Sequence, residues 1–197
     1  MRIRPYEPRD RADVADICVR TGNNGLDATG LHSTDDLLPD IYALPYVTRE
    51  PELAFVVDNG QRAVGYILGA ADTRTFAEWF SAEWWPQVAA KYAGEGQLER
   101  AIVASAANPE RMLIAAVHDY PAHLHIDLLP EAQGQGFGRE LIDMLAAALA
   151  ERGVPGLHLV VGAGNTKAQA FYRRVGFTEL ASDANGIAFG RTTAKIS

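Results

Sequence analysis

The spacing of apolar and polar residues switches between the two-residue period of strands and the 3.6-residue period of helices. In the second half of the chain it predicts a strand, a helix, a strand, a helix and a closing hairpin. These elements are expected over Ala122–Leu129, Phe137–Arg152, Gly156–Val161, Asn165–Val175, and Phe177–Leu180 with Gly186–Gly190. Because strands joined through a helix run parallel, we expect an α/β (α+β) fold with a parallel pair inside a mixed sheet.

The first half of the chain is less regular. A short strand is expected over Met1–Arg4, followed by a helix from Asp10, whose side chain is suited to cap it. Residues 21–50 are rich in glycine and asparagine at first and then predict a short helix that begins at Ser33 or Thr34. A connection this long favours a binding role or a lid.

A hairpin and an aromatic segment follow. The apolar runs Leu53–Val57 and Ala63–Ala70 flank an Asp-Asn-Gly turn, which predicts a hairpin. Aromatic residues then crowd into Thr73–Tyr92, where Pro86 interrupts or starts a helical turn. These rings either line a substrate groove or pack into the core, and apolar stripes at helical spacing are usually core.

Composition narrows the function classes. Lys and Arg number 18 against 25 Asp and Glu, which gives a net charge of −7. This sign disfavours nucleic-acid and anionic-membrane partners and suits a cationic substrate. Cys18 is the single cysteine, so an internal disulfide is excluded, and its place in the first helix favours the core. With no membrane-length apolar run and no signal-like N-terminus, we expect a cytoplasmic protein that is one domain over residues 1–197.

The most informative stretch is LLPEAQGQGFGRE, from Leu128 to Glu140, which joins a strand to a helix. Its alternating glycines let the backbone curve closely around a ligand, and the free amides and dipole of the helix start suit a diphosphate. A Rossmann fingerprint is excluded because Arg139 stands where the third glycine belongs and no carboxylate lies near His158. A P-loop is excluded because no Gly-Lys-Ser/Thr occurs. The turn could also be a tight connection that binds nothing.

The Gln-x-x-Gly-x-Gly pattern over residues 133–138, followed by a helix, a strand, Asn165 and the segment AFYRRVGF from Ala170, resembles the GNAT family of acetyltransferases. The resemblance implies a central mixed β-sheet flanked by helices, with splayed central parallel strands. It also implies acetyl-CoA as co-substrate, with its pyrophosphate on the glycine-rich turn. The cofactor-binding residues that it implies are Leu128, Leu129, Gln133, Gly134, Gln135, Gly136, Phe137, Gly138, Arg139, Asn165 and Tyr172. Asn165 is suited equally to cap its helix.

Three further segments are similar to the acetyltransferase-like C-terminal domain of O-GlcNAcase and its bacterial relatives. They are RPYEPRDRADVADIC, AFVVDNGQRAVGYILGAADT and FAEWFSAEWWPQVAAKY. The eukaryotic domain lacks an intact pyrophosphate loop, whereas this chain has one. A glycoside-hydrolase barrel does not fit in 197 residues, so Asp35 and Asp36 are not interpreted as a glycosidase pair.

Acetyl transfer to an amine needs a proton acceptor for the amine and a proton donor for the departing thiolate. Alternation along the strand places His123, His125 and Asp127 on one face. Asp127 and His125 are both candidate bases, directly or through water, and the O-GlcNAcase-like resemblance favours Asp127; either side chain could instead be purely structural. The GNAT resemblance makes Tyr172 the general acid, against the alternative of a buried ring with a solvated hydroxyl. No metal is expected, because His123 and His125 have no further ligand cluster near them in the sequence.

The function that these features predict is an N-acetyltransferase, which transfers acetyl from acetyl-CoA to the amine of a small molecule or peptide by direct attack in a ternary complex. The alternative is a non-catalytic module that binds acetyl-CoA or CoA.

Overall fold

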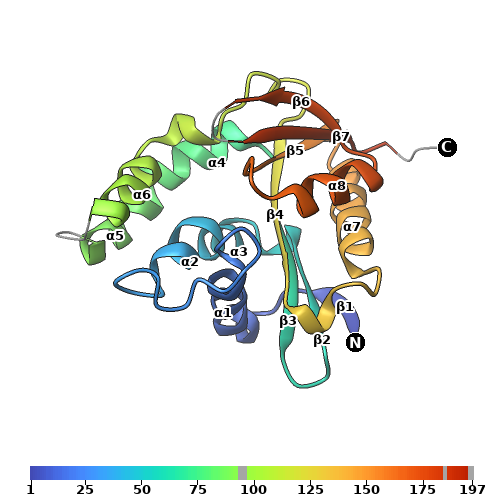
Figure 1. The fold of residues 1–197 in the computed structure, drawn as a ribbon. Helices are drawn as coiled ribbons and strands as arrows, with labels where there is room; N and C mark the ends of the chain where they lie inside the picture. Colours follow the sequence, from blue (N-terminus) through green and yellow to red (C-terminus); the bar gives the residue numbers. More distant parts are fainter. Residues whose placement is uncertain (93–96, 184–185, 195–197) are drawn as a thin grey trace.

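The computed structural model describes residues 1–92, 97–183 and 186–194. Its centre is a seven-stranded sheet in the order β1-β2-β3-β4-β5-β7-β6 (Figure 1). The strands are β1 (Arg2–Pro5), β2 (Ala54–Asp58), β3 (Ala63–Ala70), β4 (Ala122–Leu128), β5 (Gly156–Val161), β6 (Thr178–Ser182) and β7 (Ile187–Thr192). Neighbouring strands are antiparallel except β4 and β5, which run parallel. The predicted mixed sheet with a central parallel pair is confirmed.

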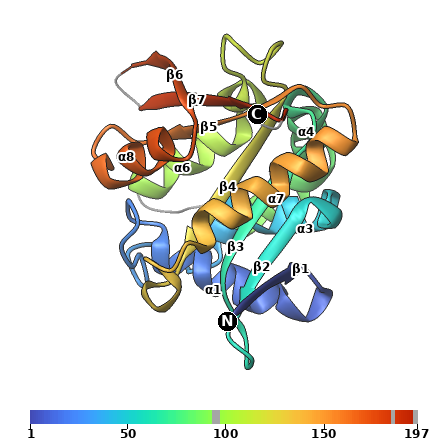
Figure 2. The same ribbon diagram turned by 90° about the vertical axis from the view of Figure 1, so that its right-hand side faces the viewer.

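Helices cover both faces of this sheet. They are α1 (Arg11–Thr21), α2 (Leu37–Tyr42), α3 (Leu44–Arg49), α4 (Thr73–Trp79), α5 (Trp85–Val88), α6 (Gln97–Ala107), α7 (Phe137–Glu151) and α8 (Thr166–Arg174). Helix α7 crosses one face and α1 lies on the other (Figure 2). Among the helices of the described residues, none combines the length and the apolar character needed to cross a membrane.

The two faces of β4 carry different chemistry, as its alternation predicts. Gly69 on β3 pairs with Leu124, and a Cβ at Gly69 would stand 2.7 Å from Leu145 Cδ1 of α7, so the leucine face of β4 packs against α7. The opposite face carries His123, His125 and Asp127 toward the side covered by α1. Polar side chains of β4 therefore gather under α1 and its neighbours.

Strands β4 and β5 pair over only a short length. Their parallel pairing consists of Ala122 with Leu157 and His123 with His158. Among the described residues, β5 beyond this point pairs only with β7, and β4 from Leu124 to Leu128 has no strand partner on its β5 side. The splayed central pair implied by the family resemblance is therefore present.

Two details of the first half differ from the sequence prediction. The Asp10 carboxylate does not cap α1; it accepts two hydrogen bonds from the Arg4 guanidinium, at 2.6 and 2.7 Å, and one from the Glu7 amide. A bidentate, charge-assisted pair is stronger than a neutral cap, so the arginine takes the carboxylate. The helix expected from Ser33 or Thr34 begins only at Leu37, because residues 33–36 form a turn before it.

Helices α4–α6 form an arm beside α2, at the left of Figure 1. Most aromatic residues of this arm are core residues, as predicted: Phe76, Phe80, Trp84 and Trp85 are buried, and Trp79 is half-buried. Pro86 lies in the first turn of α5, and a π-helical stretch over Phe80–Trp84 precedes this helix. The arm is attached to α2 through Asp40, whose carboxylate accepts hydrogen bonds from Tyr92 and Lys91 at 2.6 and 2.8 Å. Helix α6 was not predicted.

Candidate functional site

The glycine-rich turn lies between β4 and α7, and two of its residues need glycine. Gly134 and Gly136 have φ angles of +73° and +92°, a region that other L-residues rarely adopt. No atom lies within 4 Å of a Cβ placed at Gly134, and only Glu140 Oε1, at 3.9 Å, approaches one at Gly136. The space in front of the turn is therefore open.

The turn also leaves a run of backbone amides unpaired. Within the described residues, the N–H groups of Gly134, Gln135, Gly136, Phe137 and Gly138 have no protein acceptor. Pairing resumes at Arg139, whose N–H donates to the Gly136 carbonyl at 3.0 Å. These amides converge at the N-terminus of the 15-residue helix α7, where the helix dipole adds positive potential. Such an arrangement is suited to a phosphate or diphosphate.

The side chains around the turn brace it. Gln133 Nε2 donates to the Leu128 carbonyl at 2.8 Å, and Gln135 Nε2 donates to the Glu131 carbonyl at 2.6 Å. Arg139 reaches away from the turn to the Arg174 carbonyl at the end of α8. Leu129 already uses its N–H on Val64 and its carbonyl on Ala132, so it offers no free amide to a ligand.

Asp127 lies on the polar face of β4, half-buried. Its Oδ2 accepts a 2.6 Å hydrogen bond from the Tyr66 hydroxyl. Burial raises the pKa of this carboxyl, and hydrogen bonds from Tyr66 and Thr21 oppose the rise. A carboxylate whose pKa is raised is a better proton acceptor than an ordinary aspartate.

His125 belongs to a hydrogen-bonded chain whose direction can be deduced. The Thr73 hydroxyl donates to the Pro121 carbonyl at 2.6 Å and so accepts from His123 Nδ1 at 2.9 Å. His123 Nε2 then carries no proton and accepts from the Tyr46 hydroxyl at 2.7 Å. That hydroxyl in turn accepts from His125 Nε2 at 3.0 Å. This leaves His125 Nδ1 unprotonated and without a partner among the described residues.

Burial keeps both histidines of this chain neutral. Burial places the pKa of His123 well below its usual range, and the neighbouring histidines and Arg111 add to this effect. Burial and the Arg111 charge lower the pKa of His125 to about 4. His125 therefore presents a hydrogen-bond acceptor at neutral pH.

Tyr172 and Asn165 lie at the two ends of the same helix, α8. The Tyr172 ring is buried against Phe171, Phe177 and Phe189, and its hydroxyl has no hydrogen-bond partner among the described residues. Burial, with the Asp127 charge, raises its pKa, so the hydroxyl stays protonated. Asn165 caps α8, as predicted, with Oδ1 accepting from the Ala168 amide at 3.1 Å.

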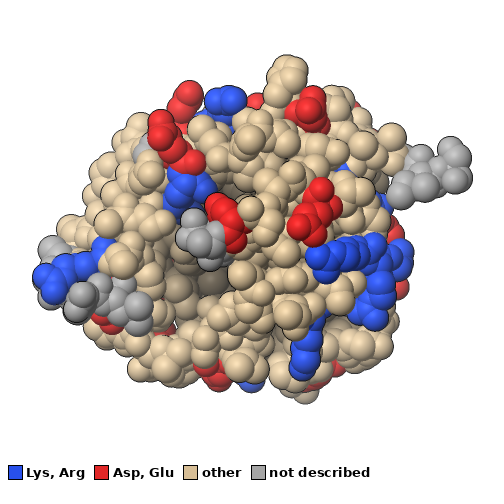
Figure 3. All heavy atoms as spheres, turned by 45° about the horizontal axis from the view of Figure 1, so that its top comes forward, with Lys and Arg blue, Asp and Glu red and all other residues tan. Residues whose placement is uncertain are grey.

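The connection between α1 and α2 reaches across the splayed strands. A Cβ at Gly162, in the β5–α8 loop, would lie 3.2 Å from Asn24 Oδ1, and one at Gly25 would lie 4.0 Å from Asn165 Nδ2. The long loop predicted as a lid or binding segment is thus in contact with the start of α8. Figure 3 shows a hollow near the middle of this side, between the α4–α6 arm and α8, with acidic and basic side chains at its rim.

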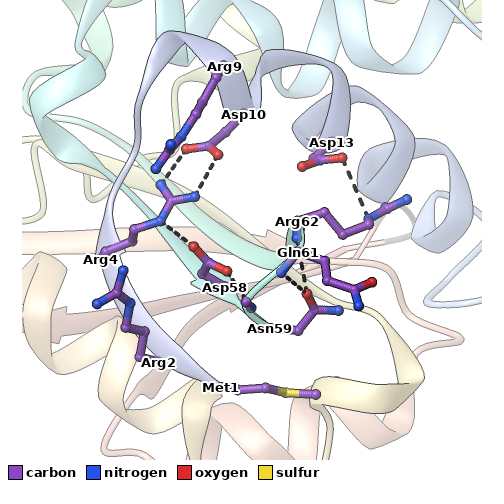
Figure 4. Close-up of a pocket in the computed structure, with 11 residues that line it drawn as sticks. Met1, Arg2, Arg4, Arg9, Asp10, Asp13, Asp58, Asn59, Gln61 and Arg62 are labelled. Atoms are coloured by element: carbon purple, nitrogen blue, oxygen red, sulfur yellow. Dashed lines mark hydrogen bonds and ion pairs between the residues drawn. The ribbon is translucent and has the colours of Figure 1, made fainter.

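A second pocket lies at the β2–β3 turn, away from the splayed strands (Figure 4). Its carboxylates are all paired with arginines: Arg4 pairs with Asp10 and Asp58 at 2.6 and 2.7 Å, and Arg62 with Asp13 at 3.6 Å. Because these ions already have partners, the pocket does not indicate a charged ligand. The described residues also contain no group of three or more side chains placed to hold a metal ion.

A splayed pair of parallel strands, followed by a turn with unpaired amides and a long helix, is the arrangement typical of acetyltransferases that use acetyl-CoA. The chain belongs to the acetyltransferase (GNAT) family, whose model matches residues 26–177. The expected family and the expected fold are both confirmed.

Individual relatives refine this placement. The chain is 24% identical over 185 residues to protein O-GlcNAcase of Rattus norvegicus, which covers 91% of this chain and 20% of that protein. The chain thus spans about one fifth of this curated relative. The crystal structure of SsHAT is 48% identical, covers 98% of both chains and superposes with a TM-score of 0.92. PaiA N-acetyltransferase from Thermoplasma acidophilum, solved in complex with coenzyme A, shares the fold at 14% identity, with a TM-score of 0.60 and coverage of 97% and 98%.

Sequence reasoning missed three side chains that touch the polar face of β4: Tyr42, Tyr46 and Tyr66. Tyr66 could have been found, because it alternates with Ile67 in a predicted strand. Tyr42 and Tyr46 lie in the irregular segment, and only tertiary packing brings them to His125.

Proposed function

We propose that this protein is an N-acetyltransferase that transfers acetyl directly from acetyl-CoA to an amine in a ternary complex. The observation that carries the proposal is the run of five unpaired amides, from Gly134 to Gly138, at the start of α7 beside the splayed strands. These groups would hold the cofactor diphosphate. The GNAT relative solved with coenzyme A supports the choice of ligand.

The residues near the point where β4 and β5 separate are suited to the two proton transfers of the reaction, one from the amine and one to the departing thiolate. When the neutral amine attacks the thioester carbonyl, an N–C bond forms and the C–S bond breaks. Asp127 accepts the proton that leaves the nitrogen, while its Oδ2 keeps the hydrogen bond from Tyr66. The Tyr172 hydroxyl donates its proton to the departing sulfur, and Asn165 Nδ2 remains free to bind the pantetheine. The products are an N-acetylated amine and CoA thiol.

Two measurements test this proposal. Isothermal titration of acetyl-CoA detects binding without turnover, and release of CoA thiol in the presence of a broad amine and peptide panel detects transfer. Binding with thiol release on at least one amine supports the proposal. Binding without release identifies a CoA-binding module, and no binding at millimolar acetyl-CoA overturns both functions.

The Tyr172→Phe variant is expected to lower kcat about 100-fold, in the range that general acids contribute. The ring and its contacts remain, so the Kd for acetyl-CoA should change by less than about twofold. Steady-state kinetics with titration measures both values. Tyr6→Phe, at the end of β1, serves as the matched control. An unchanged kcat in Tyr172→Phe would remove this hydroxyl from the acid role.

The Asp127→Asn variant is expected to lower kcat/KM about 100-fold at pH 7, because asparagine accepts the Tyr66 hydrogen bond but no proton. In the parent, the base works only when ionised. Because burial raises the pKa of Asp127, the acid limb of the kcat/KM profile is expected at a higher pH than the pKa of an unperturbed aspartate. That limb should vanish in Asp127→Asn and persist in His125→Gln. The reverse pattern would assign the base to His125.

A further inference from the structure

Arg111 is a half-buried arginine without a counterion. It lies in the 3₁₀ turn Pro109–Met112 that follows α6, and within the described residues its guanidinium makes no hydrogen bond or ion pair. Its Nε is fully buried and unpartnered. A buried donor left unsatisfied is destabilising, so the position calls for an explanation.

Other arginines of the chain show how unusual this is. The half-buried ones each pair with a carboxylate, namely Arg4, Arg62 and Arg191. Arg191 also has unpartnered nitrogens, but Asp143 neutralises its charge at 2.7 Å. In a chain of net charge −7, only Arg111 combines burial with an unneutralised charge among these described arginines.

Two aromatic rings hold the Arg111 guanidinium. Its Cζ lies 5.6 Å from the centroid of the Tyr42 ring and 5.4 Å from that of Phe80, which is completely buried. Rings that flank a guanidinium occupy its faces and leave the N–H groups along its edge. The cation is therefore fixed in place with its donors still unused.

Tyr42 also connects this cation to the proposed site of transfer. The Tyr42 and His125 rings are 5.8 Å apart. The Arg111 charge adds to the burial that lowers the pKa of His125 and His123, and it opposes the burial that raises the pKa of Tyr42. The groups facing the guanidinium are thus two neutral histidines and protonated tyrosines. A negative group on a ligand at His125 would find no competing carboxylate paired with Arg111.

We propose that Arg111 binds a carboxylate carried by the acceptor, so that the substrates are amines with a free carboxylate, such as amino acids or peptides, rather than polyamines. This inference rests on the proposed function. An edge of guanidinium N–H groups matches a carboxylate by two parallel hydrogen bonds. A single guanidinium in an acidic protein suits a monoanion better than a phosphate dianion. The negative net charge of the whole chain suggests a cationic substrate. At this site, the positive charge of Arg111 favours an anionic group on the acceptor instead.

The kinetic test compares acceptors in matched pairs: L-lysine, L-alanine and L-alanyl-L-alanine, each against its carboxamide. In the parent, the carboxylate of a reactive pair is expected to have a kcat/KM at least 10-fold higher than that of the amide. Arg111→Gln should abolish this preference by raising KM, and acetyl-CoA binding by titration should stay unchanged. The exposed Arg74→Gln on α4 is the matched control and should retain the preference. Equal preference in the parent and Arg111→Gln would overturn the proposal.

A binding measurement separates this proposal from the proposed function. The Arg111 Nε–H resonance, assigned by its loss in Arg111→Lys, is followed by NMR while L-alanyl-L-alanine or its carboxamide is added to the acetyl-CoA-free protein. A saturable shift with the carboxylate alone supports the site, even if no thiol is ever released, in which case only the transferase function fails. No shift with the carboxylate, or equal shifts with both compounds, overturns the Arg111 proposal even if acetyl transfer occurs.

Discussion

Replacing Gly136 with valine is expected to weaken acetyl-CoA binding at least 100-fold. The Gly136 backbone has φ of +92°, and a β-branched residue there costs roughly 1–3 kcal/mol. The turn can relieve this strain only by rotating the peptides that carry the unpaired amides of residues 134–138. Isothermal titration measures the loss of affinity directly.

The control for this variant lies elsewhere in the fold. Gly60, at the β2–β3 turn, has φ of +97° and nothing within 4 Å of its Cβ position. Gly60→Val should therefore lose a similar amount of stability and keep the affinity of the parent. If Gly136→Val bound acetyl-CoA as tightly as Gly60→Val, the glycine-rich turn would not be the diphosphate site, and the proposed function would lose its main support.

The second large effect concerns acid stability. Between pH 7.5 and 5.5 the free energy of unfolding is expected to fall by up to about 4 kcal/mol. Burial lowers the pKa of His123, His125 and His158 in the folded protein, and in His125 it reaches about 4. Below the unfolded value of about 6.5, the unfolded chain binds protons that the folded chain excludes. Each such histidine then contributes up to about 1.4 kcal/mol per pH unit.

Urea unfolding at a series of pH values measures this dependence. The folded state keeps the full benefit above pH 6.5 and loses it as the pH falls toward the lowered values. In His123→Gln the slope below pH 6 should decrease by about 1.4 kcal/mol per pH unit, whatever the stability of the variant at neutral pH. A slope equal to that of the parent would show that His123 titrates normally in the folded protein. The same measurement defines the pH range in which the activity profile of Asp127→Asn can be interpreted.

The second half of the fold was predictable because its signals are local. Apolar and polar residues alternate along β4, β5 is a short apolar run, and a polar cap and a terminal glycine bound α8, so these elements occur within a few residues of their expected limits. The unpaired amides follow from the glycine spacing alone. These features need no knowledge of distant neighbours.

The remainder depends on packing between distant segments. Asp10 looks like a cap until Arg4 folds onto it, and Tyr172 is more buried than its neighbour Phe171 because β6 and β7 cover that side of α8. Arg111 gave no signal in the sequence. The environment of its guanidinium is formed by Tyr42 and Phe80, which lie 69 and 31 positions earlier in the chain.

The parting of β4 and β5 gives this sheet exposed edges at its centre as well as at its borders. β1 and β6 end the sheet on the outside, while β4 beyond His123 and β5 beyond His158 each have one side without a neighbouring strand in the part of the chain that the structure describes. Backbone groups on such a side must bond to water or to a guest. The two parts of the sheet, of four and three strands, are therefore joined through only the two residue pairs between β4 and β5. A molecule that placed amide groups between these two strands would complete the sheet as an additional strand does.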